Sequence, residues 1–338
     1  MKKNKLLNLL FLSLFLLGSC GEKGKQVSLF IYTSDDTFIQ TTLKYFDEVF
    51  NNINIDIKKY DANRSQSLQN EQITEEIESK ENDVLIVNTV DRLADSAIIE
   101  KAKRYETPII FFNREPLDRD LPTTGHYYYV GSDFKNEAYL QADMIATLFG
   151  NPNNLNNIYD KNADGIIQFV MLKGEQGHQD MENRSKYVIE SLRDKGYKTE
   201  FLTSAYCNWR RDTAKESFSS MYKEYGDEIE LIISNNDDMA LGAIDYLLEN
   251  NIFSKTATSV SEQPIQIVGV DGTEVAKDAI KNHLMYGTAL NDAKKQVEVI
   301  LDLTTKIINK EDINDDLFDT GHKIYIKGKS ITLDNIND

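Results

Sequence analysis

Short runs rich in β-branched and aromatic residues alternate with longer segments of helical periodicity from about residue 27 onward. Some short runs, such as Pro108–Phe112, are almost wholly apolar, which is typical of a strand buried on both faces of a parallel sheet. The expected strands are Val27–Thr33, Ile53–Ile57, Asp83–Val87, Pro108–Phe112, Tyr127–Gly131, Ile166–Leu172, Lys198–Thr203, Ile229–Ile233, Ile265–Val270 and Met285–Ala289. The expected helices are Phe38–Phe50, Gln66–Ser79, Leu93–Arg104, Asp180–Lys195, Asp212–Tyr225, Met239–Asn250, Glu274–Asn282 and Asp292–Ile308. The series of βα units runs twice, so we expect an α/β protein with two doubly wound, parallel-sheet lobes.

A polar side chain closely follows six of the expected strands. These residues are Asp36, Asn113, His178, Asn236, Asp271 and Asn291. The carboxyl ends of parallel strands meet at one edge of a sheet, and ligands of such folds bind there. Because the six strands belong to both halves of the chain, we expect these side chains to face each other across a cleft between the lobes.

Four further residues give this cleft the chemistry of a monosaccharide site, namely Phe38, Asp180, Arg184 and Trp209. A hexose has a rim of hydroxyl groups and apolar C–H faces. Its site therefore needs carboxylate, amide and guanidinium groups at the rim and aromatic rings over the faces. Each residue alone has an ordinary explanation as a strand-end polar group, a core side chain or a surface ion pair. The ten together favour a sugar pocket.

The segments that carry these residues resemble the periplasmic glucose/galactose-binding proteins, the solute receptors of ATP-driven sugar importers. They are IYTSDDTF, IIFFNREP, YYVGSD, LKGEQGHQDMENR, ISNNDDMALGA, VGVDG and GTALNDA, and the resemblance runs from about Val27 to near the C-terminus. It implies that Phe38 and Trp209 sandwich a pyranose ring of D-glucose or D-galactose. Asp36 would accept a hydrogen bond from the 4-hydroxyl group, and the other seven residues would bond the remaining hydroxyls.

The same resemblance implies a type I periplasmic-binding-protein fold, in which a hinge of three crossovers joins the lobes. We expect the crossovers near Gly131–Phe134, Asn291 and Ser330. The N-terminal lobe would comprise residues 27–132 and 291–329, and the C-terminal lobe residues 133–290 and 330–338. The closed, monomeric protein would dock on an ABC transporter permease, and some relatives also signal to a chemoreceptor. Arg114 stands where relatives often carry Lys, and the chain ends soon after Asp334, two departures that concern the docking surface rather than the sugar site.

Residues 160–168 place oxygen donors at the spacing of an EF-hand calcium loop, with Gly165 at the sixth position. The twelfth position is Met171, which cannot bind a hard cation, so a true EF-hand is not expected. The resemblance instead implies that Glu230 completes a structural Ca²⁺ site. The expected ligands are Asp160, Asn162, Asp164, the main-chain oxygen of Ile166, Gln168 and Glu230. The alternative is a solvated Asn/Asp turn.

The N-terminus has the pattern of a secretory signal, with three early lysines before the apolar stretch Leu6–Leu17, which is too short to span a bilayer. Leu17-Gly18-Ser19-Cys20 resembles a bacterial lipobox, which predicts cleavage after residue 19 and lipidation of Cys20. Several acyl chains would anchor the protein to a bacterial membrane, facing the periplasm or the cell surface. Residues 20–26 would form a tether. An ordinary cleaved signal with an incidental cysteine is the alternative.

The overall charge argues against nucleic acid as a partner. The formal net charge is −17, and loss of residues 1–19 with Lys2, Lys3 and Lys5 makes it −20, whereas nucleic-acid binding needs basic patches. With Cys20 lipidated, Cys207 is the only thiol, and we expect it to be a packing residue rather than a nucleophile.

Two other classes of function remain as alternatives. A glycosidase would need two carboxylates flanking the scissile bond, for which Asp36 with Asp180 or Asp271 is conceivable. The expected pocket, however, encloses a free monosaccharide, and the sequence has no Walker loop and no G-x-G-x-x-G motif. We therefore expect a binding protein without catalytic residues. The second alternative is a surface adhesin or sensor, with which lipidation is compatible.

Overall fold

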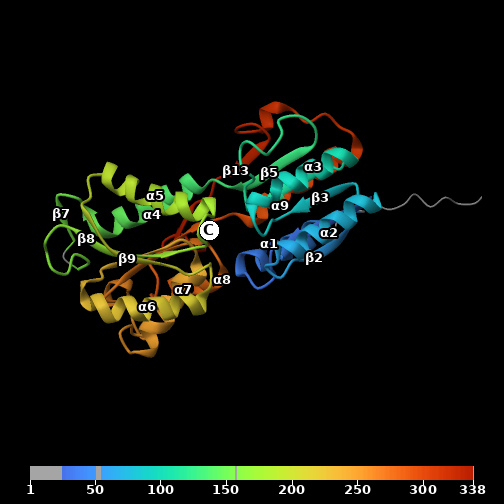
Figure 1. Ribbon diagram of the computed structural model, residues 1–338. Coiled ribbons are helices and arrows are strands. Elements are labelled where there is room, and N and C mark those ends of the chain that lie inside the picture. Colours follow the sequence, from blue (N-terminus) through green and yellow to red (C-terminus); the bar gives the residue numbers. More distant parts are fainter. Residues whose placement is uncertain (1–24, 51–54, 157, 338) are drawn as a thin grey trace, which may run out of the picture.

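The computed structural model describes residues 25–50, 55–156 and 158–337. Figure 1 shows two lobes, each built on a sheet with helices on both of its faces. The prediction of two doubly wound α/β lobes is confirmed. No helix among the described residues is both long enough and apolar enough to cross a membrane.

The first lobe is built on a six-stranded sheet in the order β13-β5-β4-β3-β1-β2, and all its described pairings are parallel. Its strands are β1 (Lys25–Ile31), β2 (Ile55–Asp61), β3 (Val84–Val87), β4 (Ile109–Phe112), β5 (Tyr127–Ser132) and β13 (Lys323–Ile326). Its helices are α1 (Thr37–Phe50), α2 (Gln66–Ser79), α3 (Asp95–Tyr105) and α9 (Ala293–Asn309), with 3₁₀ turns η1 (Arg92–Ala94) and η4 (Asp315–Leu317). Alternate residues of β4 pack on opposite faces: Ile110 and Phe112 join the core with α1 and α9, and Ile109 and Phe111 join the core with α2 and α3. This two-sided burial explains why the strand is apolar throughout.

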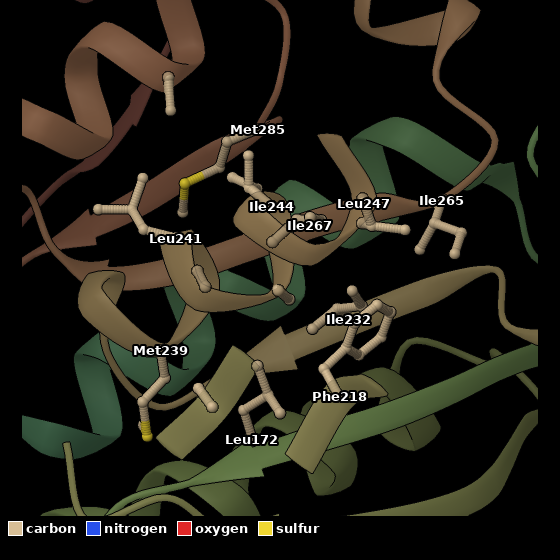
Figure 2. Close-up of a cluster of buried hydrophobic side chains, with 14 of the residues drawn as sticks. Leu172, Phe218, Ile232, Met239, Leu241, Ile244, Leu247, Ile265, Ile267 and Met285 are labelled. Atoms are coloured by element: carbon tan, nitrogen blue, oxygen red, sulfur yellow. The ribbon is translucent and has the colours of Figure 1, made fainter. Parts of the chain in front are cut away.

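The second lobe has a six-stranded sheet in the order β14-β12-β11-β10-β8-β9, in which only β14 is antiparallel to its neighbour. Its strands are β8 (Ile167–Lys173), β9 (Thr199–Tyr206), β10 (Leu231–Ser234), β11 (Gln266–Asp271), β12 (Gly287–Leu290) and β14 (Ser330–Thr332). Its helices are α4 (Phe134–Phe149), α5 (Gln179–Asp194), α6 (Arg211–Tyr225), α7 (Asp237–Glu249) and α8 (Glu274–Lys281), with η2 (Gly226–Glu228), η3 (Val260–Glu262) and the small hairpin β6 (Gly150–Asn151)–β7 (Asn154–Leu155). Figure 2 shows one face of this sheet, where Ile232 and Ile267 pack against α7 and Phe218 of α6.

The chain passes between the lobes at three places that lie against one another. The Asp133 N–H, after β5, donates to the Ile326 carbonyl (2.9 Å), and the Leu290 N–H, after β12, donates to the Lys329 carbonyl (2.8 Å). A Cβ at Gly328 would lie 1.8 Å from the Leu290 oxygen, so only glycine allows the last crossover to pass so close to the second. The carboxyl ends of both sheets therefore open toward the same space.

The structure differs from the sequence-based expectations at the start of the first strand, at the second strand, which lies at Ile55–Asp61 rather than Ile53–Ile57, and in elements that were not expected, among them β13 and α4. Lys25 and Gln26, expected in the tether, belong to β1 and pair with Ile55 and Asp56 of β2. The sequence also gave no expectation for α4, whose inward-facing side chains include the polar Glu137 and Gln141. A helix that buries polar residues among its apolar ones lacks a clean apolar stripe, so its periodicity is weak.

Candidate functional site

All ten residues expected in the sugar pocket line one cavity between the two lobes, together with Tyr32 and Arg114. Asp36 and Asn113 are partly exposed, and each of the others is at most 9 % exposed. Bonds cross the cleft from one lobe to the other: Arg114 Nη2 donates to Glu175 Oε2 (2.7 Å), and Gln179 Nε2 donates to the Asn113 carbonyl (3.2 Å). The cavity is therefore a closed cleft, as in a binding protein that has shut on its ligand.

The orientation of the Asn113 amide is set by bonds from its own lobe. The Tyr32 N–H donates to Asn88 Oδ1 (3.2 Å), so the Asn88 amide must donate with its Nδ2, which it does to Asn113 Oδ1 (3.0 Å). Asn113 has a left-handed backbone (φ 60°), a conformation that asparagine tolerates better than most residues. Since its oxygen is already used, Asn113 is left to offer the N–H groups of its amide to a ligand.

In Asn236 and Asn291, too, the amide oxygen is occupied by a hydrogen bond within the protein. Asn236 Oδ1 caps α7 by accepting the Met239 N–H (2.9 Å), and Asn291 Oδ1 accepts from Gln296 Nε2 (2.6 Å). Both residues therefore present N–H donors in a region where hydroxyl oxygens of a ligand can accept.

The carboxylates supply the acceptors. Asp36 is held by the Ile39 N–H on Oδ1 (2.9 Å) and by the Tyr32 hydroxyl on Oδ2 (2.7 Å). Asp180 Oδ1 is buried without a hydrogen-bond partner among the described residues. Burial raises the pKa values of Asp180 and Asp271, and the nearby Arg184 guanidinium opposes this shift in both. Buried carboxylates with spare lone pairs favour a ligand that brings its own donors.

His178 and Trp209 form one wall. His178 caps α5 by accepting the Asp180 N–H on Nδ1 (3.2 Å), which places the ring proton on Nε2. Burial, followed by the positive charges of Arg114 and Arg184, lowers the pKa of His178 well below its usual value, so the ring is a neutral donor. It meets the Trp209 ring edge-on, with centroids 5.0 Å apart. Phe38 faces the cavity from the other lobe.

Sequence analysis missed Tyr32 and Arg114 as members of this cavity. The Arg114 guanidinium stacks on the Tyr32 ring at 4.1 Å, and the Tyr32 hydroxyl reaches Asp36. The signal in the sequence is weak: Arg114 directly follows Asn113, and Tyr32 directly follows the first strand.

The structure brings the expected calcium ligands together. Glu230, just before β10, accepts the backbone N–H groups of Lys161 (2.6 Å) and Gln168 (3.2 Å), so a residue distant in sequence closes the loop 160–168. Asp164 contacts Gln168 Nε2 (2.9 Å) and accepts the Ile166 N–H (2.8 Å). Burial raises the pKa of Glu230 to about 7.

The donors at this loop are all oxygens, which fits a hard cation such as Ca²⁺. Gln168 Oε1 is buried without a hydrogen-bond partner in the described part of the chain. No group of three or more His, Cys, Asp or Glu side chains converges as a metal cluster within the described residues. The expected set instead mixes carboxylate, amide and main-chain oxygens, and calcium binding stays a prediction.

Of the two cysteines, only Cys207 belongs to the described residues. Cys207 is fully buried, and burial raises its pKa to about 11, which fits a packing residue. The signal segment and Cys20 lie outside the described residues, so lipidation also stays a prediction.

Comparison with known proteins identifies the family. A model described as a periplasmic binding protein domain matches residues 27–312. The chain is 36 % identical over 284 residues to the D-galactose/methyl-galactoside binding periplasmic protein MglB of Haemophilus influenzae, which covers 83 % of this chain and 81 % of that protein. A putative rhizopine-binding protein of Rhizobium meliloti is 26 % identical over 75 % of this chain and 72 % of its own.

Two solved structures of similar fold are described as solute-binding proteins of ABC transporters. One from Actinobacillus succinogenes with bound D-allose has a TM-score of 0.78 at 20 % identity, covering 93 % of this chain and 99 % of its own. One from Bacillus halodurans with bound myo-inositol has a TM-score of 0.76 at 23 % identity, covering 94 % and 98 %. These relatives are binding proteins of transport systems rather than enzymes, which confirms the expectation of a non-catalytic protein. The chain belongs to the periplasmic binding protein domain family, with the type I fold of two α/β lobes.

Proposed function

We propose that the protein binds a free aldohexose, D-galactose or D-glucose, in the cleft between its lobes and delivers it to the permease of an ABC sugar importer. The observation that carries this proposal is the closed cleft, which is lined by fixed amide N–H donors, by carboxylate acceptors and by the rings of Phe38 and Trp209 from opposite lobes. A ring with hydroxyls at its rim and C–H groups on its faces matches that arrangement. The relative from Haemophilus influenzae, named for galactose binding, supports the choice of hexose.

D-galactose and D-glucose differ in the configuration of the 4-hydroxyl group, which we expect to lie next to Asp36. Its two oxygens are held by Tyr32 and Ile39, yet each retains a free lone pair. We expect this carboxylate to accept from a 4-hydroxyl in either configuration, so that both C4 epimers bind. Myo-inositol and D-allose are bound in proteins of similar fold. Their affinities for this protein would show how selective the site is for the positions of the other hydroxyl groups.

The test is calorimetric titration of purified residues 21–338 with D-galactose, D-glucose, D-allose, myo-inositol and D-ribose. We expect micromolar or tighter binding of the first two, corresponding to about −8 kcal/mol or more favourable, and at least about tenfold weaker binding of the others. Several charge-assisted hydrogen bonds of about 1.5–3 kcal/mol each are sufficient for this. Tight binding of another ligand alone would refute the assignment of the hexose.

We also propose that loop 160–168 with Glu230 holds a structural Ca²⁺ ion. The support is the set of oxygen donors and the buried, unpartnered Oε1 of Gln168. A bound cation would supply positive charge beside Asp160 and Glu230, which carry like charges close together. Glu230→Gln should lower the Tm more in calcium than in chelator, because it removes a metal ligand as well as one backbone hydrogen bond. Glu228→Gln, an exposed neighbour, should respond like the wild type. An equal loss of Tm in calcium and in chelator would contradict the metal role.

A lipid anchor at Cys20 is the third part of the proposal. It rests on the lipobox-like LGSC segment after the apolar stretch. The anchor would keep the receptor close to its permease.

A further inference from the structure

Glu137 is a buried charge that the sugar chemistry did not lead us to expect. It lies in the first turn of α4, one turn after the first crossover, and is 0 % exposed. Its Oε2 accepts from Arg184 Nε at 2.7 Å, and the Arg184 side chain is itself 3 % exposed. Removing both charges from water is costly even when they pair, so a buried pair of this kind is weak evidence of a purely stabilising role.

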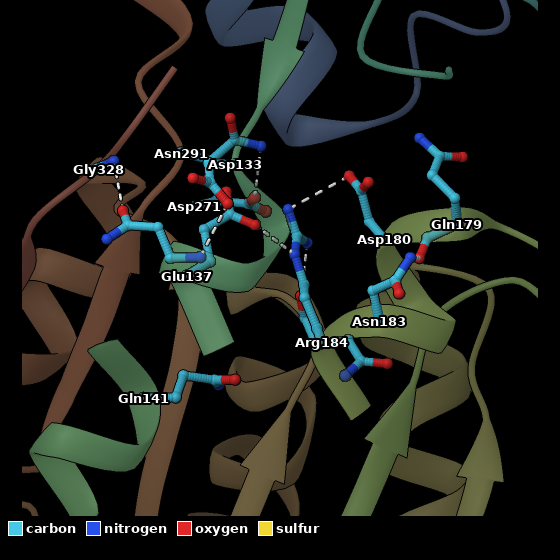
Figure 3. Close-up of polar contacts among 12 residues, drawn as sticks. Asp133, Glu137, Gln141, Gln179, Asp180, Asn183, Arg184, Asp271, Asn291 and Gly328 are labelled. Carbon is cyan, nitrogen blue, oxygen red and sulfur yellow. Dashed lines mark hydrogen bonds and ion pairs between the residues drawn. The ribbon is translucent and has the colours of Figure 1, made fainter. Parts of the chain in front are cut away.

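The contacts of Arg184 show what the pair does to the guanidinium. Nε donates to Glu137 and Nη1 donates to the Asn235 carbonyl (2.8 Å), whereas Nη2 lies 3.4 Å from Asp180 Oδ2. Because the guanidinium is planar, fixing Nε and Nη1 also fixes Nη2. Figure 3 shows Arg184 between Glu137 on one side and Asp180 on the other. The shorter bond goes to Glu137, away from the acceptors expected to serve the ligand.

Without Glu137, the carboxylates left to neutralise Arg184 would be Asp180 and Asp271, and both line the cavity. Arginine favours a two-pronged pair with a carboxylate, which would use the oxygens that a sugar needs. Asp180 Oδ1 has no partner among the described residues, so it is available to a hydroxyl in the present arrangement. Glu137, Asp180 and Arg184 all belong to the same lobe, so this arrangement does not depend on closure.

We propose that Glu137 is a positioning residue of the binding site, which holds Arg184 so that the guanidinium donates to the ligand and does not form a two-pronged pair with Asp180 or Asp271, leaving both able to accept from the ligand. This inference rests on the proposed sugar-binding function and adds a residue that does not line the cavity itself.

The proposal has an electrostatic signature that a purely structural role lacks. The charged groups that face Glu137 are Arg184 and Asp180 on α5, Asp271 at the end of β11, and Asp133 at the start of its own helix. Burial raises the pKa values of Asp180 and Asp271, and the negative charge of Glu137 raises them further. Removing that charge should lower both pKa values. Since the ionised carboxylates accept hydroxyl hydrogen bonds, loss of affinity on acidification should then begin at a lower pH.

The test uses two variants of the full mature chain. Glu137→Gln keeps the shape but removes the charge, and Glu137→Asp keeps the charge but shortens its reach. The Kd for D-galactose and D-glucose is measured by calorimetry between pH 5 and pH 9. We expect Glu137→Gln to raise the Kd about tenfold or more at pH 8, as for loss of one charge-assisted bond, and to move the acidic loss of affinity to lower pH. Glu137→Asp should raise the Kd while the pH profile stays at the wild-type position.

The matched control is Glu76→Gln, another buried glutamate. Glu76 pairs with Lys58 at 2.5 Å on the outer side of the first lobe and does not line the cavity. We expect it to lower the Tm but leave the Kd and its pH profile unchanged. Folded Glu137 variants that behave like this control would overturn the positioning role. A wild-type protein that binds none of the hexoses would overturn the proposed function as well, which distinguishes the two failures.

Discussion

Adding one methyl group behind Trp209 tests whether this ring forms a wall of the binding site. A Cβ at Gly174 would lie 2.2 Å from the indole ring, whereas carbon atoms in contact lie about 3.5–4.0 Å apart. The Gly174 N–H is bonded to Asn235 Oδ1 (3.2 Å), so the backbone is held in place. In Gly174→Ala the indole must therefore move by more than about 1 Å, away from residue 174.

The expected loss of affinity follows from the change in the contact distance between the Trp209 ring and the bound sugar. A change of about 0.5–1 Å in a contact forfeits about a quarter to a half of its dispersion energy, and a ring pushed into the cavity also collides with the ligand. We expect the Kd to rise about 10- to 100-fold, which is about 1.4–2.8 kcal/mol. None of the hydrogen-bonding groups is altered by this substitution.

Gly242→Ala is the matched control, because a Cβ at Gly242 would lie 2.2 Å from the Arg211 carbonyl oxygen between α6 and α7, outside the cavity. Both variants should lose thermal stability, and only Gly174→Ala should lose affinity. Calorimetry gives the Kd, and the fluorescence of Trp209, the only tryptophan, reports the displaced ring. A folded Gly174→Ala protein with the wild-type Kd would refute the role of Trp209 as a wall of the site.

Three further predictions concern other parts of the chain. Trp209→Ala should weaken hexose binding by more than Gly174→Ala does while the circular dichroism spectrum is retained; unchanged calorimetric titration would contradict stacking. Burial raises the pKa of the fully buried Asp95 to about 8, so the folded state holds an extra proton between about pH 4 and pH 8, and stability from this group falls as pH rises through that range. Asp95→Asn should remove that part of the pH dependence of Tm, and an unaltered slope would exclude Asp95 as its source. Cys20→Ala should release the protein from membranes in cell fractionation, and persistent membrane association would defeat the lipid anchor.

The order of strands and helices could be read from the sequence because apolar strands and helical periodicity are local patterns. α2 was expected over Gln66–Ser79 and lies there, and α1, expected from Phe38, begins at Thr37. Helix α4 was not predicted from the sequence because its buried face carries the polar residues Glu137 and Gln141. Their partners, Arg184 and the Ser234 and Gly269 carbonyls, lie far away in sequence, so no local pattern marks these polar residues as internal.

The candidate site also contains residues that the sequence predicted and residues that it did not. Nine of its ten expected residues lie at the ends of strands or the starts of helices, and Arg184 lies in the second turn of α5. Parallel strands place such positions at one edge of the sheet wherever the rest of the fold goes. The sequence analysis missed Tyr32 and Arg114, which reach the cavity through contacts with Asp36 and Glu175. The Arg114–Glu175 contact depends on how a loop from one lobe meets a loop from the other, which residue spacing does not record, whereas the Tyr32–Asp36 bond lies within one loop.

Local sequence was thus sufficient for the α/β class, the two lobes and the kinds of side chain at the cleft. It could not specify that Asn113 offers its N–H groups or that Arg184 is turned by Glu137. Those properties depend on hydrogen bonds between residues up to tens of positions apart. An amide or a guanidinium has several ways to present its donors and acceptors, and only the packed surroundings select one of them.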